Sequence, residues 1–299
     1  MSSAIRTYAL SKKFRNTVAL DRLDLDVPEG AIYGLTGPNG AGKSTCIKLL
    51  LKIHRQSGGH SEVLGTDSRR LSPAELAQIG YVSENQEMPE WMTPGYFLNY
   101  LSAFYPTWDR ALAADLLRQF QLAADGRIKQ LSRGMRMKLA LASSMAYRPK
   151  LIVLDEPFSG LDPLVRDELI ESLLARAEST TIFISSHDLA EIESFASHVG
   201  YLEAGKLQFS EELESLSARF REVVLTFPAA PPEAAEWPRS WLSPERAYGV
   251  VRFVEMQFHP ERTASEVHRV FPGFRDIAVS AMPLRSIFVT LAKAARATA

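Results

Sequence analysis

The chain has 299 residues, of which 46% are hydrophobic and 23% are charged, which is typical of a globular protein with one large domain and a smaller appendage. Its 34 lysine and arginine residues nearly balance 35 acidic residues, which argues against a nucleic-acid-binding or lipid-binding surface driven by overall charge. The sequence contains no signal-like N-terminus, no run of 18 apolar residues and only one cysteine, Cys46. We therefore expect a cytoplasmic protein that does not span a membrane by itself.

Short apolar runs alternate with helical patterns over the first 210 residues. Residues 31–37 (AIYGLTG), 151–157 (LIVLDEP) and 180–188 (TTIFISSHD) each contain an apolar run typical of a buried strand. Helical spacing follows the first run in TCIKLLLKIH and the second in PLVRDELIESLLARA. Strands that alternate with helices predict an α/β fold with a parallel core sheet.

Two further segments complete the predicted organisation. Residues 92–125 are predicted to be helical with a break at Pro106, as part of a helical subdomain inserted at about residues 86–145. Beyond about residue 210, the proline-rich run FPAAPPEAAEWP cannot form a regular element. Around it, REVVLTF and YGVVRFVEMQF alternate like strands, while ERTASEVHRVF and PLRSIFVTLAKAARA have the spacing of amphipathic helices. We therefore predict two domains, residues 1–210 and a small α+β appendage at residues 211–299.

The run GPNGAGKST matches G-x-x-x-x-G-K-[ST] between a predicted strand and a predicted helix, as a phosphate-binding loop requires. Glycines let successive N–H groups point at phosphate oxygens, and the helix adds the positive end of its dipole. Lys43 can reach the β- and γ-phosphates, and the Ser44 hydroxyl can ligate Mg²⁺. The residues expected to bind the triphosphate are Gly37, Pro38, Asn39, Gly40, Ala41, Gly42, Lys43, Ser44 and Thr45. The alternative for this run alone is a glycine-rich turn with an exposed lysine.

Two adjacent acids, Asp155 and Glu156, follow the apolar run LIVL. The carboxyl end of a buried strand is where α/β sheets bind their ligands. Adjacent carboxylates repel each other, so a nearby cation is the natural reason for placing them together. Asp155 is expected to hold Mg²⁺ through water, and Glu156 to polarise the water that attacks the γ-phosphate. The pair therefore predicts hydrolysis as well as binding.

Further motifs follow in a characteristic order: IGYVSENQEM, LSRGM at residues 131–135, SGLD at residues 159–162, and His187 in ISSHD. With the phosphate loop, they make roughly residues 3–209 resemble the nucleotide-binding subunits of ABC transporters. The resemblance implies a P-loop NTPase core that hydrolyses ATP with Mg²⁺. It also implies that His187 contacts the γ-phosphate and that Phe14 stacks on adenine. Taken alone, His187 could be a satisfied strand-end histidine and Phe14 a core residue.

The resemblance also implies a working assembly. Two such domains dimerise head to tail, and each ATP lies between the phosphate loop of one chain and the LSRGM signature of the other. Ser132 and Gly134 would then contact the ATP bound by the partner, and Asp162 would lie at the dimer seam. Ser132 also fits a helix N-cap, a role compatible with anion binding. Dimer closure would drive a separate membrane-spanning permease, with the chain on the cytoplasmic face of the cell membrane as a homodimer or a heterodimer.

The chain departs from the family pattern at two motifs. The usual Q-loop places glutamine at position 84, where this chain has Glu84, and Gln86 follows two residues later. Either residue, Gln86 or Glu84, could supply the contact to Mg²⁺ and water. The signature has Arg133 and Met135 where glycine and glutamine are commoner. The S-x-G-M form and the C-terminal tail resemble ABC-2 type exporters, which favours export over import.

The alternative function is a soluble ABC-type ATPase that is not coupled to transport, acting as a binding or regulatory module. Translation-type members carry two cassettes, and repair-type members have long heptad-repeat arms; neither feature occurs in this sequence. A subunit that binds ATP without turnover is disfavoured because Glu156 and His187 are both present, and an ordinary P-loop kinase or GTPase would lack LSRGM. The sequence leaves the transported substrate and the role of residues 211–299 open.

Overall fold

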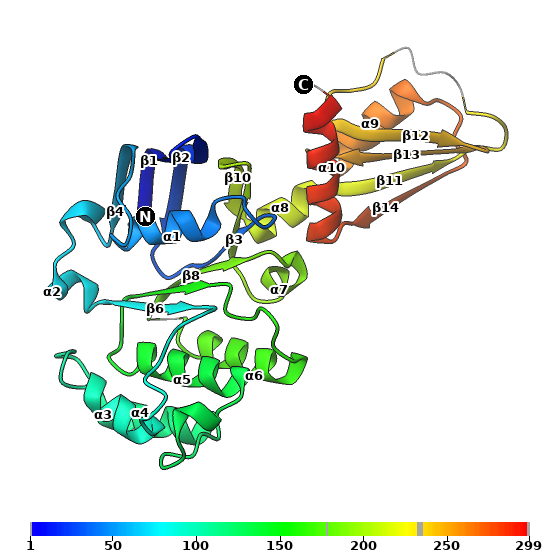
Figure 1. Ribbon diagram of the computed structural model, residues 1–299. Coiled ribbons are helices and arrows are strands. Elements are labelled where there is room, and N and C mark those ends of the chain that lie inside the picture. The colour runs from blue at the N-terminus through cyan, green and yellow to red at the C-terminus, as the bar shows by residue number, and fades with distance from the viewer. Residues whose placement is uncertain (1, 178, 232–235, 298–299) are drawn as a thin grey trace. The chain divides into compact units, whose positions relative to one another are not determined.

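The computed structural model describes residues 2–177, 179–231 and 236–297. The chain divides into two compact units, Met1–Ser210 and Glu211–Ala299 (Figure 1). Each unit has a hydrophobic core of its own. The two units are therefore described separately.

The first unit is built around a six-stranded sheet with strand order β10-β9-β3-β8-β7-β6. The pairs β3–β8, β3–β9, β7–β8 and β6–β7 are parallel, which confirms the predicted parallel core. Every residue of β3, β7 and β8 is buried, as expected for strands covered on both faces. The strand bounds are β3 Ile32–Thr36, β6 Ile79–Ser83, β7 Leu151–Asp155, β8 Thr181–Ser186, β9 His198–Glu203 and β10 Lys206–Glu212.

A second sheet of four strands, in the order β2-β1-β4-β5, was not predicted from the sequence. Its β1–β2, β1–β4 and β4–β5 pairs are antiparallel. One apolar cluster joins Leu10 and Leu23 of this sheet to Ile47 of helix α1 and to Leu35 and Phe183 of the parallel sheet. Helix α1 thus lies between the two sheets (Figure 1). The bounds are β1 Ser3–Phe14, β2 Thr17–Pro28, β4 Gly58–Val63, β5 Thr66–Asp67 and α1 Lys43–Leu50.

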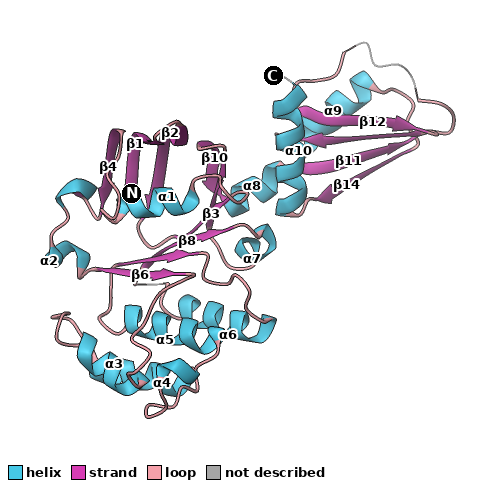
Figure 2. Ribbon diagram, viewed as in Figure 1, coloured by secondary structure: helices cyan, strands magenta, loops and turns pink. Residues whose placement is uncertain are grey.

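Helices α5 and α6 cover the face of the parallel sheet away from α1 (Figure 2). The last nine residues of α5 are all buried, so this part of the helix is packed on every side. Short helices connect the remaining strands. The bounds are η1 Ser68–Arg70, α2 Pro73–Leu76, α5 Arg133–Met145, α6 Pro163–Leu174 and α7 Leu189–Glu193.

The predicted helical segment 92–125 is two helices, α3 (Pro94–Leu101) and α4 (Arg110–Gln119), followed by η2 (Ile128–Gln130). The break predicted at Pro106 is confirmed, but it is longer than expected, because tertiary contacts hold the whole connection between α3 and α4 in a non-helical path. The Tyr105 ring stacks on Tyr147 with 3.8 Å between ring centroids, and the Thr107 hydroxyl donates to the Tyr147 carbonyl at 2.6 Å. Asp109 then caps α4 by accepting a hydrogen bond from Leu112 N.

Helix α1 also ends earlier than the pattern TCIKLLLKIH indicates. It stops at Leu50, because Lys52 has a left-handed backbone with φ of 58°. The N–H of His54 then donates back to the carbonyl of Lys48 at 2.8 Å. Apolar spacing continued past this point, so the periodicity alone could not locate the end of the helix.

The second unit is an α+β structure with a four-stranded antiparallel sheet, in the order β12-β13-β11-β14. The strands predicted at REVVLTF and YGVVRFVEMQF and both predicted helices are confirmed, whereas β12 and β14 were not predicted. Helix α9 closes the core through Val267, which packs with Val223 and Phe253. Part of the proline-rich run, residues 232–235, lies outside the described residues. The bounds are α8 Leu213–Arg219, β11 Arg221–Thr226, β12 Trp241–Ala247, β13 Val250–Glu255, α9 Pro260–Val270, β14 Asp276–Ala281 and α10 Leu284–Ala297.

Candidate nucleotide site

The predicted phosphate loop connects the end of β3 to the start of α1, at the carboxyl edge of the parallel sheet. Gly37 and Gly42 have φ of 150° and 111°, in a region that side chains rarely adopt. A Cβ atom at Gly37 would clash with the carbonyl oxygen of Leu202, and one at Gly42 would lie 2.5 Å from the carbonyl oxygen of Ala19. Both positions therefore require glycine for conformation and for space, and the loop is fixed against β2 and β9.

Lys43 is the first residue of α1, and its side chain is only 5% exposed. Its Nζ donates to the carbonyl oxygens of Gly37 at 2.7 Å and Pro38 at 3.3 Å, so the ammonium is held inside the curl of the loop. It also lies 3.1 Å from Oε1 of Glu156. The loop thus presents a buried positive charge, which is what binding of a phosphate chain requires.

Ser44 and Asp155 lie together at the ends of α1 and β7. The Ser44 hydroxyl donates to Oδ1 of Asp155 at 2.9 Å, and Asp155 is 7% exposed. One hydroxyl and one carboxylate are hard oxygen donors suited to Mg²⁺, which normally completes its shell with water and substrate phosphate. Over the described part of the chain, no group of three or more His, Cys, Asp or Glu side chains gathers to hold a metal alone. The donor set therefore fits Mg²⁺ that arrives with a nucleotide.

Glu156 follows β7 with a left-handed backbone, φ 51°, which is uncommon for a residue other than glycine. Its Oε2 is 2.7 Å from Nδ1 of His187 and also accepts a hydrogen bond from the His187 backbone N–H. Its Oε1 is buried and accepts no aligned hydrogen bond from any described protein group, although the Lys43 charge is near. A buried carboxylate oxygen with spare acceptor capacity can orient a water molecule.

The hydrogen bond from His187 to Glu156 has a consequence for the imidazole. An ionised carboxylate only accepts hydrogen bonds, so Nδ1 of His187 carries a proton in this arrangement. The His187 side chain is 48% exposed, which leaves the ring accessible to a ligand. The structure thus brings Lys43, Ser44, Asp155, Glu156 and His187 into one connected cluster.

Ser185, the residue two before His187 on β8, belongs to the same cluster and was not predicted. Its hydroxyl donates to Oδ1 of Asp155 at 2.7 Å and accepts from the N–H of Glu156 at 3.1 Å. It therefore positions both acids at once. The available signal was its place in ISSHD, since β8 pairs with β7 in parallel and brings this serine opposite Asp155.

Phe14 and the two Q-loop candidates lie outside this cluster of bonded side chains. Phe14, at the end of β1, is 41% exposed and carries the Lys12 ammonium 4.6 Å from its ring centroid. The Glu84 carboxylate accepts from Nη2 of Arg133 at 2.8 Å. Gln86 turns back to accept a long hydrogen bond, 3.4 Å, from the N–H of Ser83.

The residues expected to act on a partner's ATP occupy two helix starts. Ser132 caps α5 by accepting from Met135 N at 3.2 Å, as its N-cap pattern predicts. Gly134 lies in the first turn of α5, beside Val165 of α6. Asp162 caps α6 by accepting from Val165 N at 3.1 Å. Two adjacent helix N-termini combine their positive dipole ends, which suits an anionic ligand.

Cys46 faces the core and not the site. It is fully buried within α1, and burial raises the pKa of its thiol to about 12. At neutral pH the thiol is therefore protonated and unreactive, and it packs as a small apolar residue.

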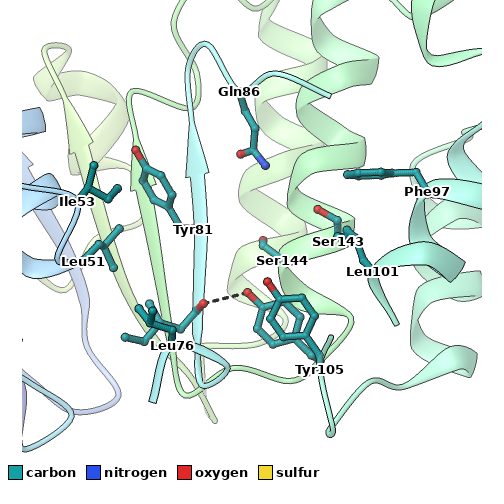
Figure 3. A pocket seen from close by; sticks show the side chains of 12 residues that line it. Leu51, Ile53, Leu76, Tyr81, Gln86, Phe97, Leu101, Tyr105, Ser143 and Ser144 are labelled. Atoms are coloured by element: carbon teal, nitrogen blue, oxygen red, sulfur yellow. Dashed lines mark hydrogen bonds between the residues drawn. The ribbon is translucent and has the colours of Figure 1, made fainter. Parts of the chain in front are cut away.

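A cavity of about 330 Å³ opens between the core sheet and α3, next to Gln86 (Figure 3). Leu51 and Tyr81 line it on the sheet side, and Phe97 and Leu101 of α3 line the opposite wall (Figure 3). The Tyr147 hydroxyl donates to the Ile79 carbonyl at 2.9 Å and closes one end. The cavity is thus lined mainly by apolar and aromatic side chains, with the Gln86 amide at its rim.

Comparison with known proteins gives one consistent family. Residues 20–159 match the model of the ABC transporter family. The daunorubicin resistance ATP-binding protein DrrA2 of Streptomyces coeruleorubidus is 36% identical over 209 residues, covering 68% of this chain and 65% of that protein. The bacitracin transport ATP-binding protein BcrA of Bacillus licheniformis is 33% identical over 235 residues, covering 74% of each chain. The match thus spans slightly less than two thirds of DrrA2.

A solved structure described as the ATP-binding subunit of an ABC transporter has the same fold as the first unit. Its TM-score is 0.66 at 26% identity, covering 72% of this chain and 92% of that one. The fold, the connected cluster at the strand ends and the sequence relatives agree on the same family. The chain therefore belongs to the ATP-binding subunits of the ABC transporter family and carries one ATPase cassette of the P-loop type.

Proposed function

We propose that this chain binds and hydrolyses ATP as the energising subunit of an ABC transporter of the export type. The observation that carries the proposal is the connected cluster of Lys43, Ser44, Asp155, Glu156 and His187 at the carboxyl edge of the parallel sheet. It combines a phosphate-binding cation, hard oxygen donors and a carboxylate with a spare acceptor atom. These are the groups that phosphoryl transfer to water needs.

When ATP binds in this site, the Lys43 ammonium would exchange the Glu156 carboxylate for a phosphate of the nucleotide. The γ-phosphate would take the ammonium that now lies beside Glu156, and the freed Oε1 would orient the attacking water. As an imidazolium, which donates from both ring nitrogens, His187 would keep Nδ1–H on Glu156 and donate from Nε2 toward the γ-phosphate. Mg²⁺ held near Ser44 and Asp155 would neutralise charge on the phosphates. The exposed Phe14 ring would stack on adenine, and Gln86 or Glu84 would add a contact near the attacking water.

We further propose that the site is completed by a second chain, identical or homologous. Ser132, Gly134 and Asp162 lie at the starts of α5 and α6, where Ser132 and Asp162 accept hydrogen bonds from backbone N–H groups of their own helices. In a head-to-tail dimer these helix starts would face the γ-phosphate bound by the partner. A single chain would then bind ATP and hydrolyse it slowly.

The transport role needs a membrane-spanning permease as partner. No helix in the described ranges is long and apolar enough to cross a bilayer. Helix α3 and its flanks instead expose four large aromatic side chains, Trp91, Tyr96, Tyr100 and Phe104, with exposed fractions of 47–64%. Exposed aromatic clusters beside a cavity are typical of protein-binding surfaces. We propose that a cytoplasmic segment of the permease docks here, at the cytoplasmic face of the membrane.

The names of the relatives support export. One is a daunorubicin resistance protein and the other a bacitracin transport protein. Both are described as ATP-binding proteins, which agrees with a permease on a separate polypeptide. The competing function is an ABC-type ATPase that is not coupled to transport.

Affinity purification from detergent-solubilised cells distinguishes the two functions. The transport role predicts co-purification of a polytopic membrane protein, lost in Tyr100→Asp combined with Phe104→Asp, with ATP binding retained. Tyr248→Asp, at a fully exposed tyrosine of the second unit, is the matched control and should keep the partner. Recovery of ribosomes or DNA without a membrane protein would instead establish the uncoupled function.

A further inference from the structure

The two departures from the family pattern contact each other. Glu84 stands at the usual glutamine position of the Q-loop, and Arg133 stands within the LSRGM signature, 49 residues later in the chain. Nη2 of Arg133 donates to Oε1 of Glu84 at 2.8 Å, and the side chains are 51% and 34% exposed. The carboxylate of Glu84 and the guanidinium of Arg133 have opposite charges and bond to each other. The two departures from the family pattern therefore form one ion pair.

Both ends of this ion pair are tied to the catalytic machinery. The N–H of Glu84 donates to the carbonyl oxygen of Asp155 at 2.9 Å, so its backbone is fixed to the last residue of β7, directly before Glu156. Arg133 directly follows Ser132, the cap of α5. Its guanidinium also lies against Gly160, where an added Cβ would be 3.0 Å from Nη1. Gly160 is two residues before Asp162, the cap of α6. Arg133 therefore also contacts the loop that leads into α6.

We infer that the Glu84–Arg133 ion pair couples the ATP site of one chain to the signature that this chain offers its partner. The inference rests on the proposed head-to-tail dimer. The negative charge of a phosphate beside Asp155 repels the Glu84 carboxylate and attracts the Arg133 guanidinium. Bound ATP therefore changes the electrostatic force on the start of α5. That start carries Ser132 and Gly134. Glu84 and Arg133 are thus positioning residues that link the two sites of the dimer.

A purely structural role predicts something different. An exposed ion pair contributes little to folding, so neutralising either residue should barely change the melting temperature. The same helix provides a control, because Arg136 of α5 donates to Glu90 at 3.0 Å with comparable exposure, 36% and 55%. Arg136 also donates to the carbonyl oxygens of Lys129 and Leu131, so Glu90→Gln is the closer match. Glu90 and Arg136 form a second bridge between the same loop and the same helix. Only the coupling role predicts that the two pairs behave differently.

The test uses the single variants Glu84→Gln and Arg133→Gln and one charge-swapped double variant, Glu84→Arg combined with Arg133→Glu. The control variants are Glu90→Gln and Arg136→Gln. Two quantities are measured: the ATP concentration for half-maximal dimerisation by analytical ultracentrifugation, and the Hill coefficient of ATP hydrolysis. We expect each single variant at 84 or 133 to raise the half-maximal concentration about fivefold and to lower the Hill coefficient. The charge swap re-forms an ion pair but reverses its response to phosphate charge, so it should stay impaired in both quantities, and the 90 and 136 variants should match wild type.

The outcomes separate the two proposals. If wild type neither dimerises with ATP nor hydrolyses it, the proposed function fails. If wild type does both and the 84 and 133 variants equal the control pair, the function stands and the coupling is refuted. If the single variants are impaired and the swap restores both quantities, an ion pair of either polarity is sufficient and coupling through phosphate charge is refuted. Melting curves for every variant check that the fold is retained.

Discussion

The ammonium of Lys43 lies 3.1 Å from Oε1 of Glu156, so the group proposed to bind phosphate and the group proposed to activate water neutralise each other. A phosphate must displace the carboxylate from the lysine before both groups can work. The displaced carboxylate remains anchored through His187, whose Nδ1 lies 2.7 Å from Oε2. On the proposed function, binding of ATP and release of the Glu156 carboxylate from Lys43 would therefore be the same event.

Glu156→Gln should abolish turnover while ATP binding is kept. The amide cannot accept a proton, and a general base contributes about 10²–10⁴-fold to the rate. Because Lys43 also loses its competing carboxylate, the variant should bind ATP at least as tightly as wild type and accumulate ATP-bound dimers. Phosphate release and gel filtration with ATP measure these effects. Glu171→Gln, at an exposed position of α6, is the control, and hydrolysis at wild-type rate in Glu156→Gln would refute the role of Glu156.

Ser185→Ala should impair both stability and catalysis. The hydroxyl donates to Asp155 and accepts from the N–H of Glu156, and each of these groups keeps a second partner, Ser44 Oγ and the Ser185 carbonyl. The loss of these bonds should therefore cost about 0.5–1.5 kcal/mol of stability. Misplacement of the two acids should lower kcat about tenfold, equivalent to about 1.4 kcal/mol. Ser143→Ala is the matched control, since that buried hydroxyl donates to Ala140 O of its own helix. Equal kcat values for the two variants would remove Ser185 from the catalytic machinery.

A mixture of two inactive chains should recover activity if the site is shared. Lys43→Ala destroys the phosphate loop and Ser132→Arg blocks the signature, so each homodimer is inactive. A mixed dimer contains one intact pairing of loop and signature. With random assortment about half the dimers are mixed and one of their two sites works, so about a quarter of wild-type activity should return if the sites act independently. Titration of one variant into the other measures this, and no recovery at any ratio would exclude the head-to-tail arrangement.

Cys46 should make stability fall at high pH. Its folded pKa is raised to about 12 by burial, whereas the exposed thiol of the unfolded chain ionises near its ordinary value of 9.0. The protonated thiol therefore stabilises the folded state fully below about pH 9, and this contribution is lost as pH rises from about 9 to about 12. Urea unfolding at pH 8 and pH 10 should show a smaller decline in Cys46→Ala than in wild type. Parallel declines would mean that the thiol does not titrate differently in the two states.

The parallel core could be predicted because its strands are buried on both faces and form continuous apolar runs. The antiparallel sheet was missed even though β2 carries a signal, since Leu23, Leu25 and Val27 alternate with aspartates. Strand β1 lacks so regular a pattern, because the register shifts between Thr7 and Leu10. Pro106 predicted a break between α3 and α4, whereas the path of the connection could not be predicted, because it depends on contacts with Tyr147, about 40 residues away in the chain.

Most of the candidate site could be predicted from the sequence, because its functional residues lie at or after the ends of core strands. The functional side chains follow or end core strands: Asp155 ends β7, His187 follows β8, and Lys43 stands after the loop that follows β3. Parallel pairing of these strands brings the three positions together. Ser185 was missed because a serine within an apolar strand gives no chemical signal until its neighbour on β7 is known. The partner of Glu84 could not be identified for a similar reason, since it is set by how α5 meets the loop after β6.

The contact between Glu84 and Arg133 also constrains how such chains can diverge. A lineage that regains glutamine at position 84 would leave the guanidinium at 133 without its carboxylate, and one that loses the arginine first would leave the carboxylate beside the nucleotide phosphates. On the proposed coupling, either intermediate should couple the two sites less well than the two end states. The two positions should therefore change together, and this subgroup of cassettes should be recognisable in ancestral reconstructions by a paired replacement.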